Sequence, residues 1–271
     1  MYRQFYLTNA EGSVWQLTDQ SFKAYLNAPQ GLGQSETLVT TVYGDVARVN
    51  DEEYSFPQVT GEMLFYDDAN SDRYQKYNDF ARFISYKSLT LHYTIPTNPA
   101  ETYTLPCYCT VISKGEVGRD GILTCAVTFQ GLDFWRGAEV TVIGSTLTST
   151  TLVNDGDYPV GFNIRLAGSM VEPYFTLSQD GEVYGEAKFL DSAAFDTVQV
   201  DSQDGQQKVV LTQGGSVVAN PIAYQDLSIS NGEIYVTFIK LARGVSTLDV
   251  GKSSGTLTSV TVTYTPRYRS V

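Results

Sequence analysis

Few residues in this chain have the types and spacing that acid–base or nucleophilic chemistry needs. The sequence has a single histidine, His92, and three cysteines, Cys107, Cys109 and Cys125. A histidine can activate a nearby thiol as a nucleophile, so a cysteine hydrolase is one chemical interpretation. His92 lies in the alternating run 89–95, however, where a histidine more often fills a strand position. A glycosidase would need only two carboxylates, but no pair stands out among the 30 acidic residues, so we expect no catalytic residue and no enzyme.

The cysteines do not outline a metal site. Cys107 and Cys109 are two residues apart, which places both side chains on one face of a strand. A structural zinc ion needs four ligands, and no C-x-x-C pair accompanies His92. The odd number of cysteines argues against a disulfide framework. We therefore predict three reduced, structural cysteines in a protein that folds in a reducing cytoplasm.

An acidic pattern near residue 70 resembles a calcium-binding loop without matching it. Asp68, Asn70 and Asp72 alternate along the chain, and Asp79 follows at the twelfth position. The sixth position of such a loop needs glycine for its sharp turn, and here it is Arg73. Asp68 and Asp72 stand at the start of a predicted helix, where the helix dipole favours negative charge. We predict helix capping at this place and no metal ion.

Composition disfavours several kinds of partner and cofactor. The formal net charge is −12, which disfavours binding to nucleic acid. Gly31 and Gly33 resemble the start of a dinucleotide loop, but Glu36 stands where the third glycine belongs. No apolar run approaches the roughly 20 residues that cross a bilayer, and residues 1–7 do not resemble a signal peptide. We predict no cofactor, no specific nucleic-acid partner and no membrane contact.

One segment, Ser71–Ser85, has a pattern that predicts a helix. A serine that can cap the helix is followed by apolar residues at spacings of three and four. Phe80 and Phe83 widen this apolar stripe beyond what one core requires. The helix is therefore a candidate belt that contacts its own domain and a neighbouring protein, because aromatic residues are favoured at interface centres. The residues that we expect at such an interface are Tyr74, Tyr77, Phe80, Phe83 and Ile84.

Short alternating or β-branched runs, separated by turn signals, make up the rest of the chain. Loops are expected at 28–33, 51–53 and 114–121, and turns at dipeptides such as Asp155–Gly156 and Asp180–Gly181. This pattern predicts a mainly β protein built from antiparallel β-sandwiches. The predicted strands cover residues 4–8, 13–17, 38–43, 58–66, 89–95, 103–113, 122–130, 140–143, 163–166, 208–211, 234–239 and 257–264.

A domain boundary is expected where this alternation stops, at Gln130–Gly137. With 271 residues, the chain is long enough for two domains that each hold a core. We predict an N-terminal β-sandwich over residues 1–136, with one helix near 71–85. A second β-sandwich with almost no helix should follow over residues 137–271.

Carbohydrate binding is an alternative function, because acidic, tyrosine-rich sandwiches can bind sugars by stacking. In the second domain a platform for a sugar would have to use Tyr158, Phe162, Tyr174 or Tyr184. Ordinary burial explains these aromatic residues more simply. A cell-wall carbohydrate-binding module is therefore the second interpretation.

Five patches of the sequence resemble the distal tail proteins of long-tailed bacteriophages. They occur in that family's order over nearly the whole chain, and the single predicted helix fits the same family. Each patch alone is a weak signal, whereas their order makes the resemblance specific. The five patches are Met1–Gly12, Pro29–Gly33, Asn154–Pro159, Asn163–Gly168 and Leu241–Leu248.

The resemblance implies a structural virion protein at the tail tip, made in the cytoplasm of the bacterial host. Its N-terminal domain is expected to assemble into a homohexameric ring, and its C-terminal domain to be galectin-like. The ring would join the tail tube protein to the tail-tip or tail-lysin protein and hold receptor-binding or baseplate proteins. No tryptophan or histidine follows Trp135, which departs from a sugar-binding galectin site. We therefore expect no glycan binding by the second domain.

Overall fold

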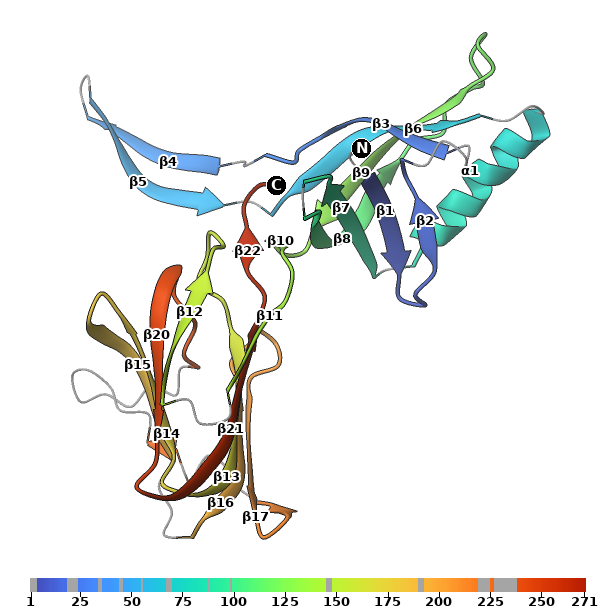
Figure 1. The fold of residues 1–271 in the computed structure, drawn as a ribbon. Coiled ribbons are helices and arrows are strands. Elements are labelled where there is room, and N and C mark those ends of the chain that lie inside the picture. The colour runs from blue at the N-terminus through green and yellow to red at the C-terminus, as the bar shows by residue number, and fades with distance from the viewer. Residues whose placement is uncertain are drawn as a thin grey trace. The chain divides into compact units, whose positions relative to one another are not determined.

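The chain folds into two compact units, shown in a computed structural model (Figure 1). The first unit contains residues up to Ala138 together with Tyr268–Val271, and the second contains Glu139–Arg267. The last residues thus return to the first unit, which the sequence did not indicate. The structure describes residues 4–18, 24–33, 36–43, 46–54, 56–66, 70–86, 88–97, 99–144, 148–189, 193–218, 225–226 and 238–271.

An antiparallel sheet forms the body of the first unit, and we call it the large sheet. Its described strands follow the order β2-β1-β7-β8-β9-β6-β3, with β10 paired to β8 and β22. Six predicted strands lie in this sheet, namely those at 4–8, 13–17, 58–66, 89–95, 103–113 and 122–130. The bounds are β1 (Gln4–Asn9), β2 (Val14–Gln16), β3 (Ala24–Gln30), β6 (Gln58–Phe65), β7 (Leu89–Ile95), β8 (Glu101–Ile112), β9 (Leu123–Gly131), β10 (Trp135–Arg136) and β22 (Arg267–Tyr268).

One predicted loop of the first unit is a strand, and another is partly a strand. Residues 51–53 lie in β5 (Val46–Tyr54), which pairs only with β4 (Glu36–Tyr43) among the described strands (Figure 1). Pairing with β4 therefore overrides the low strand propensity of acidic residues. The loop expected at 28–33 begins later, because β3 runs to Gln30. Its register shifts between Asn27 and Gln30, so that a bulge accommodates Pro29 within the strand.

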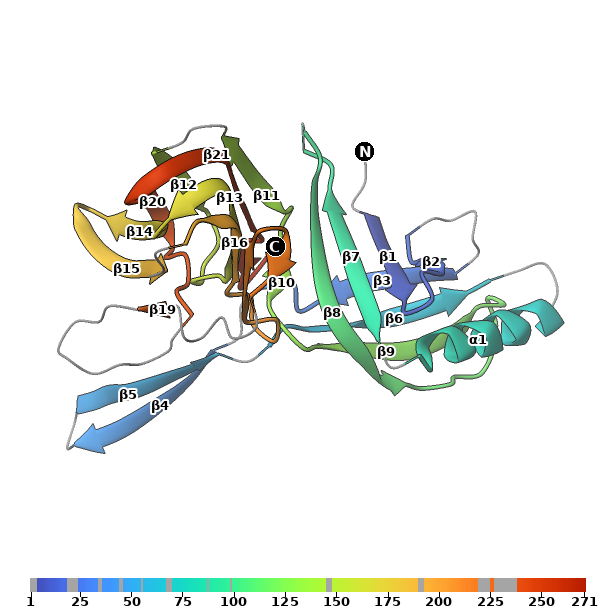
Figure 2. The ribbon, with the colours of Figure 1, turned by 90° about the horizontal axis from the view of Figure 1, so that it is seen from below.

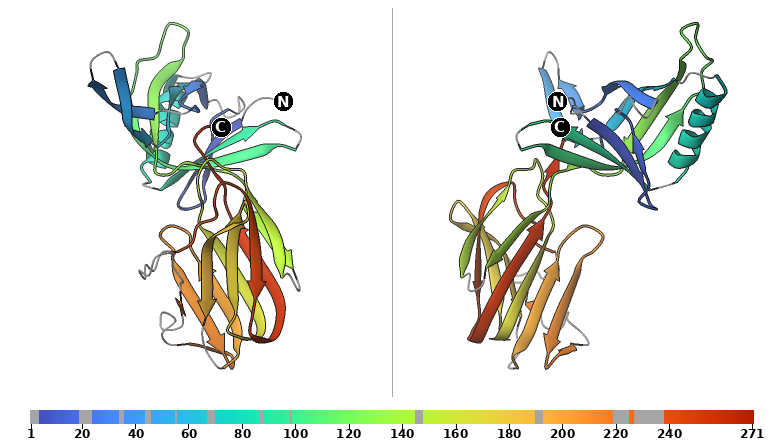
Figure 3. Two further views of the ribbon diagram at one scale, coloured as in Figure 1. Left: turned by 90° about the vertical axis from the view of Figure 1, so that its left-hand side faces the viewer. Right: turned by 45° about the vertical axis from the view of Figure 1, so that its right-hand side comes forward.

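The second unit is built from two antiparallel sheets (Figure 3). One, which we call the β13 sheet, has its described strands in the order β11-β21-β13-β16-β17-β18, and the other, the β14 sheet, has the order β12-β20-β14-β15-β19. The first set is β11 (Val140–Gly144), β21 (Ser254–Tyr264), β13 (Phe162–Val171), β16 (Phe195–Asp201), β17 (Lys208–Gln213) and β18 (Ser216–Val217). The second set is β12 (Ser149–Asn154), β20 (Gly244–Gly251), β14 (Tyr174–Gln179), β15 (Glu182–Phe189) and β19 (Gln225–Asp226).

One hydrophobic core joins these two sheets. Ile164 and Val262 of the β13 sheet pack in the same cluster as Phe175 and Leu248 of the β14 sheet. The described part of this unit contains no helix, and its paired strands are antiparallel. The prediction of a mainly β fold is confirmed, while a galectin-like second domain stays a prediction. Most of the strand expected at 234–239 falls on residues 227–237, outside the described residues.

Asn154, in one of the patches named above, closes the end of β12. Its fully buried side-chain amide donates to the carbonyl oxygens of Tyr158 at 2.8 Å, Ala242 at 3.3 Å and Leu241 at 3.4 Å. Its Oδ1 accepts a hydrogen bond from the Gly156 amide at 3.2 Å. One side chain therefore satisfies backbone groups of the turn after β12 and of the segment before β20.

Asn154→Ala should lower the free energy of unfolding of the second unit by about 1–3 kcal/mol, because buried backbone groups lose their partner. Amide hydrogen exchange resolved to peptides of the second unit measures this loss. Thr151→Ala, at an exposed position of the same strand, is the matched control and should change little. An equal effect of the two substitutions would contradict the role assigned to Asn154.

Candidate functional site

The helix α1 (Asn70–Ile84) lies where the sequence predicted it and covers the large sheet with its aromatic stripe. Phe80 is fully buried, with its ring centroid 5.3 Å from that of Trp15 in β2 and 5.8 Å from that of Phe65 in β6. Phe83 and Ile84 are each only 9% exposed and belong to the same core. These three side chains are therefore used within the first unit.

Tyr74 and Tyr77 lie along the side of this contact and are partly buried. The hairpin between β8 and β9 reaches them, and Figure 2 shows it beside α1. The Lys114 ammonium lies 4.8 Å from the ring centroid of Tyr74 and 5.4 Å from that of Tyr77, which is cation–π distance. The Tyr74 hydroxyl donates to Glu116 Oε2 at 3.4 Å. The aromatic stripe of α1 thus contacts two parts of its own unit, the large sheet and this hairpin.

Only part of the candidate interface keeps surface that a neighbour could contact. Tyr74 and Tyr77 retain such surface, whereas Phe80, Phe83 and Ile84 are in the core. A ring interface at this helix stays a prediction, carried by the two tyrosines. The pattern of the helix gave no signal of Lys114 and Glu116, because they come from a distant hairpin.

His92 lies on the face of the large sheet opposite the core. In β7 the buried positions alternate with partly exposed ones, and His92 is partly exposed. Its ring stacks on Tyr6 at a centroid distance of 4.2 Å, and its Nε2 is 3.0 Å from Thr8 Oγ1. Partial burial lowers the pKa of His92 from its ordinary value. The imidazole is thus packed as part of the sheet surface.

The cysteines face the other way, which separates them from His92. Cys107 and Cys125 are buried in the core and Cys109 packs against it, and all three are free thiols. Burial raises the pKa of Cys107 to about 12 and that of Cys125 to about 11, so these thiols resist forming the nucleophilic thiolate. The geometry gives no support to a cysteine–histidine pair. Two of the thiols fill space in the core, and the third lies against it.

The calcium-like and dinucleotide-like patterns have structural explanations where they are described. Asp79 pairs with Arg82 of the same helix at 3.6 Å, while Asp68 and the side chain of Ser71 lie outside the described residues.

Gly31 has a φ of +87°, and a Cβ there would lie 1.7 Å from the carbonyl oxygen of Gln58. Its role is a close backbone approach between chain segments. No group of three metal-ligating side chains occurs within the described ranges.

The aromatic residues considered for sugar binding are dispersed. Phe162 is in the core of the second unit, and Tyr158 is partly buried. The Tyr184 hydroxyl donates to Ser246 Oγ at 2.9 Å and accepts from the Ala242 amide at 3.3 Å. Tyr174 lines a cleft on the surface of the second unit.

Comparison with known proteins identifies relatives of this architecture. Residues 4–132 match a family described as the N-terminal domain of distal tail proteins. A chain of the activated phage P2 baseplate with calcium aligns over 100% of both chains, at 14% identity and a TM-score of 0.58. The SPP1 Dit protein aligns over 97% of this chain and 98% of its own, at 15% identity and a TM-score of 0.69. At these identities the structural likeness shows a shared fold.

The SPP1 protein is described as a paradigm of the hub adsorption apparatus in phages that infect Gram-positive bacteria. No curated protein sequence matches the chain. The described residues include no helix that is long and apolar enough to cross a membrane.

Because Phe80 is in the core and Tyr74 is only partly buried, substitutions at these two positions of α1 should lower the free energy of unfolding by different amounts. Phe80→Ala should lower the free energy of unfolding of the first unit by about 3–5 kcal/mol, because it leaves a cavity in the core. Tyr74→Ala should cost only about 1 kcal/mol, through loss of a half-buried ring and its cation–π contact. Hydrogen exchange of the large sheet reports both values. Gln75→Ala, at an exposed position of α1, is the control, and similar costs at positions 80 and 74 would contradict the division.

The lowered pKa of His92 predicts a loss of stability in mild acid. The unfolded chain takes up a proton near the ordinary histidine pKa of about 6.5, whereas the folded imidazole resists protonation. Stability is therefore complete above that pH and falls as the pH drops through and below it. His92→Gln should remove this part of the pH dependence. Because the chain has one histidine, its imidazole signal in ¹H NMR gives the pKa directly, and a value above 6.5 would contradict the prediction.

Proposed function

Because residues 4–132 match the N-terminal domain of distal tail proteins, we propose that the chain belongs to that family and is the hub at the distal end of a phage tail. The match covers nearly all of the first unit before residue 138 and carries the proposal. The shared fold with SPP1 Dit extends over 97% of the chain and supports it. The protein is then a structural component of the virion tail tip, made in the host cytoplasm.

A hub of this kind is a closed ring, and we propose that six protomers form it. A ring requires a head-to-tail interface in which two different surfaces of the protomer meet. The β4–β5 sheet supplies one such surface, because its two strands pair only with each other among the strands that the structure describes, which leaves both outer edges unpaired there. An isolated two-stranded sheet is only marginally stable in water. Contact with the neighbouring protomer would complete it.

Tyr74 and Tyr77 are proposed for the opposing surface. They keep exposed area on α1, and Lys114 and Glu116 hold Tyr74 in place through the contacts described above. A tyrosine fixed in this way loses little conformational freedom on binding, which favours it at an interface. The two surfaces differ in composition, as a ring interface requires.

The ring is proposed to join the tail tube protein to the tail-tip or tail-lysin protein. The second unit would hold receptor-binding or baseplate proteins, and its strand edges offer places for such contacts. A net charge of −12 suits a ring through which DNA passes without being held. We assign no catalytic step to the chain, because His92 stacks on Tyr6 and the cysteines pack in or against the core.

The ring proposal predicts a mass of about six protomers for the full chain at high concentration. Light scattering coupled to size exclusion measures the mass, and negative-stain imaging shows the shape. Replacing residues 36–54 by a short Gly–Ser link should leave smaller species while the large sheet keeps its hydrogen-exchange protection. Tyr74→Ser should also weaken assembly more than it lowers stability.

Val217→Ser is the control, because this side chain is 68% exposed and lies in the second unit. It should leave the mass unchanged. A chain that stays monomeric at high concentration, and that binds neither tail-tube nor tail-tip proteins encoded beside it, would overturn the hub proposal.

A further inference from the structure

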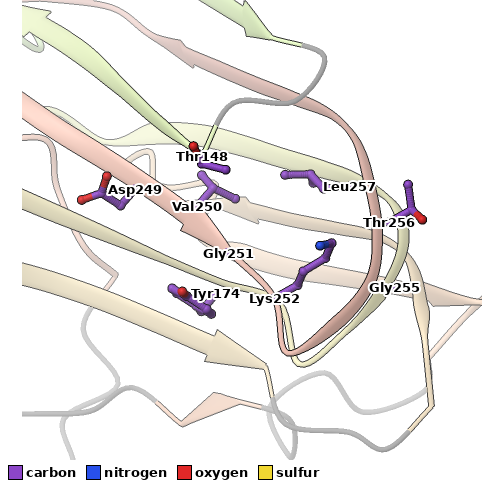
Figure 4. Close-up of a pocket in the computed structure, with 9 residues that line it drawn as sticks. All are labelled: Thr148, Tyr174, Asp249, Val250, Gly251, Lys252, Gly255, Thr256 and Leu257. Carbon is purple, nitrogen blue, oxygen red and sulfur yellow. The ribbon is translucent and has the colours of Figure 1, made fainter.

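A cleft in the second unit is not explained by a role in the ring. It has a volume of about 530 Å³ and is open to solvent. Its walls come from the start of β14, the end of β20, the turn that follows and the start of β21 (Figure 4). The lining residues that matter here are Thr148, Tyr174, Asp249, Gly251, Lys252 and Leu257.

Tyr174 forms an aromatic wall of this cleft. It pairs with Gly251 across β14 and β20, and a Cβ on Gly251 would lie 2.2 Å from Cζ of the tyrosine. The ring therefore lies across the glycine, where any other residue would push it away. Its side chain is 36% exposed, so one side rests on the backbone and part of the ring stays open to solvent. A flat aromatic surface supported in this way is suited to stacking.

Charged groups stand beside this ring without partners of their own. Asp249 lies on the same strand as Gly251, and Lys252 follows it in the turn. Among the described residues, neither side chain makes a hydrogen bond or ion pair, and the hydroxyl of Tyr174 makes none. A carboxylate acceptor, an ammonium donor and a phenol are therefore available to a ligand within one cleft.

The cleft is also held in shape. Glu172, just before β14, has a φ of +46°, an unfavourable conformation for a residue other than glycine. Its carboxylate accepts a hydrogen bond from the hydroxyl of Ser253 in the turn after β20. This bond ties the two turns that border the cleft. Glu172 does not line the cleft itself, but this bond fixes the turn that leads into Tyr174.

Within the second unit, the cleft lies at the end away from the connection to the first unit. The lining turn precedes β21, and the chain returns to the first unit only after that strand. Eleven residues of β21 separate the two places, which is about 35 Å of extended chain. The connection to the first unit therefore does not line the cleft.

From these observations we propose that the cleft binds a sugar ring of a cell-surface polysaccharide. A pyranose has an apolar face that stacks on Tyr174 and hydroxyl groups that can bond to Asp249 and Lys252. A nucleic acid would be disfavoured by the net charge of −12, and a lipid chain needs a deeper apolar cavity. This proposal departs from the expectation, drawn from the absence of tryptophan and histidine after Trp135, that the second domain binds no glycan.

The test is a titration of the full-length chain, isotopically labelled, with single sugars. The probes are glucose, galactose, rhamnose, N-acetylglucosamine and N-acetylgalactosamine, observed by methyl and amide NMR. At least one should shift the signals of Leu257 and Gly251, with a dissociation constant on the order of 1 mM, because a shallow cleft buries little of its ligand. A purified wall polysaccharide built from that sugar should compete for the same signals.

Three substitutions and one control locate the binding. Tyr174→Ala should weaken it about tenfold or more, whereas Tyr174→Phe, which keeps the ring, should stay within about threefold of the unchanged chain. Gly251→Ala keeps the tyrosine but displaces its ring, and should weaken binding like Tyr174→Ala. Tyr108→Ala removes a tyrosine of similar exposure, 42%, from the first unit and should have no effect.

Hydrogen exchange of the β14 sheet shows whether each variant keeps the fold of the second unit. If none of the five sugars shifts these signals, or if a folded Tyr174→Ala variant binds as well as the unchanged chain, the proposal is overturned. The hub proposal is tested separately by the mass of the assembly, so either can fail without the other.

Discussion

A β-strand sends alternate side chains to opposite faces of its sheet. In strands such as β7 and β14, the side chains on the covered face form the core, and those on the other face stay accessible. In β7 this places Leu91 in the core and His92 on the outer face. In β14 it places Phe175 in the core and Tyr174 outside. A shift of the register by one residue would exchange these sets. The alternation thus separates the residues that hold the fold from those that remain available to partners.

The covering of the large sheet by α1 follows from this constraint. A sheet with one apolar face needs a second layer to cover it, and here that layer is α1. Phe80 of α1 packs against both Trp15 and Phe65 of the sheet. The β8–β9 hairpin then closes over the side of the helix through Lys114. A helix packed on two sides in this way suits the hub proposed above, in which force on the ring would pass through each protomer.

The spacing of apolar residues along the sequence predicted the elements that this spacing alone determines. Strand β7 occupies the predicted residues 89–95, and α1 begins one residue before the predicted start. Residues 51–53 were predicted to be a loop, because their acidic composition disfavours a strand, whereas their pairing depends on residues of β4 that lie 12 to 16 positions earlier in the chain. The predicted interface stripe was only partly accessible, since burial of Phe80 depends on strands distant in sequence. The cleft brings Thr148, Tyr174 and Lys252 together, and no periodicity in the sequence relates such separate segments.

The second unit is inserted into the first, which resumes at Tyr268. The returning segment is anchored by the T-shaped contact of Tyr268 with Tyr103 and by the Val271 amide, which donates to the carbonyl oxygen of Leu32 at 3.1 Å. During translation, residues 268–271 of the first unit are therefore made only after the whole inserted unit has been synthesised. A chain interrupted within the insertion therefore lacks the contacts that Tyr268 and Val271 make with the rest of the first unit.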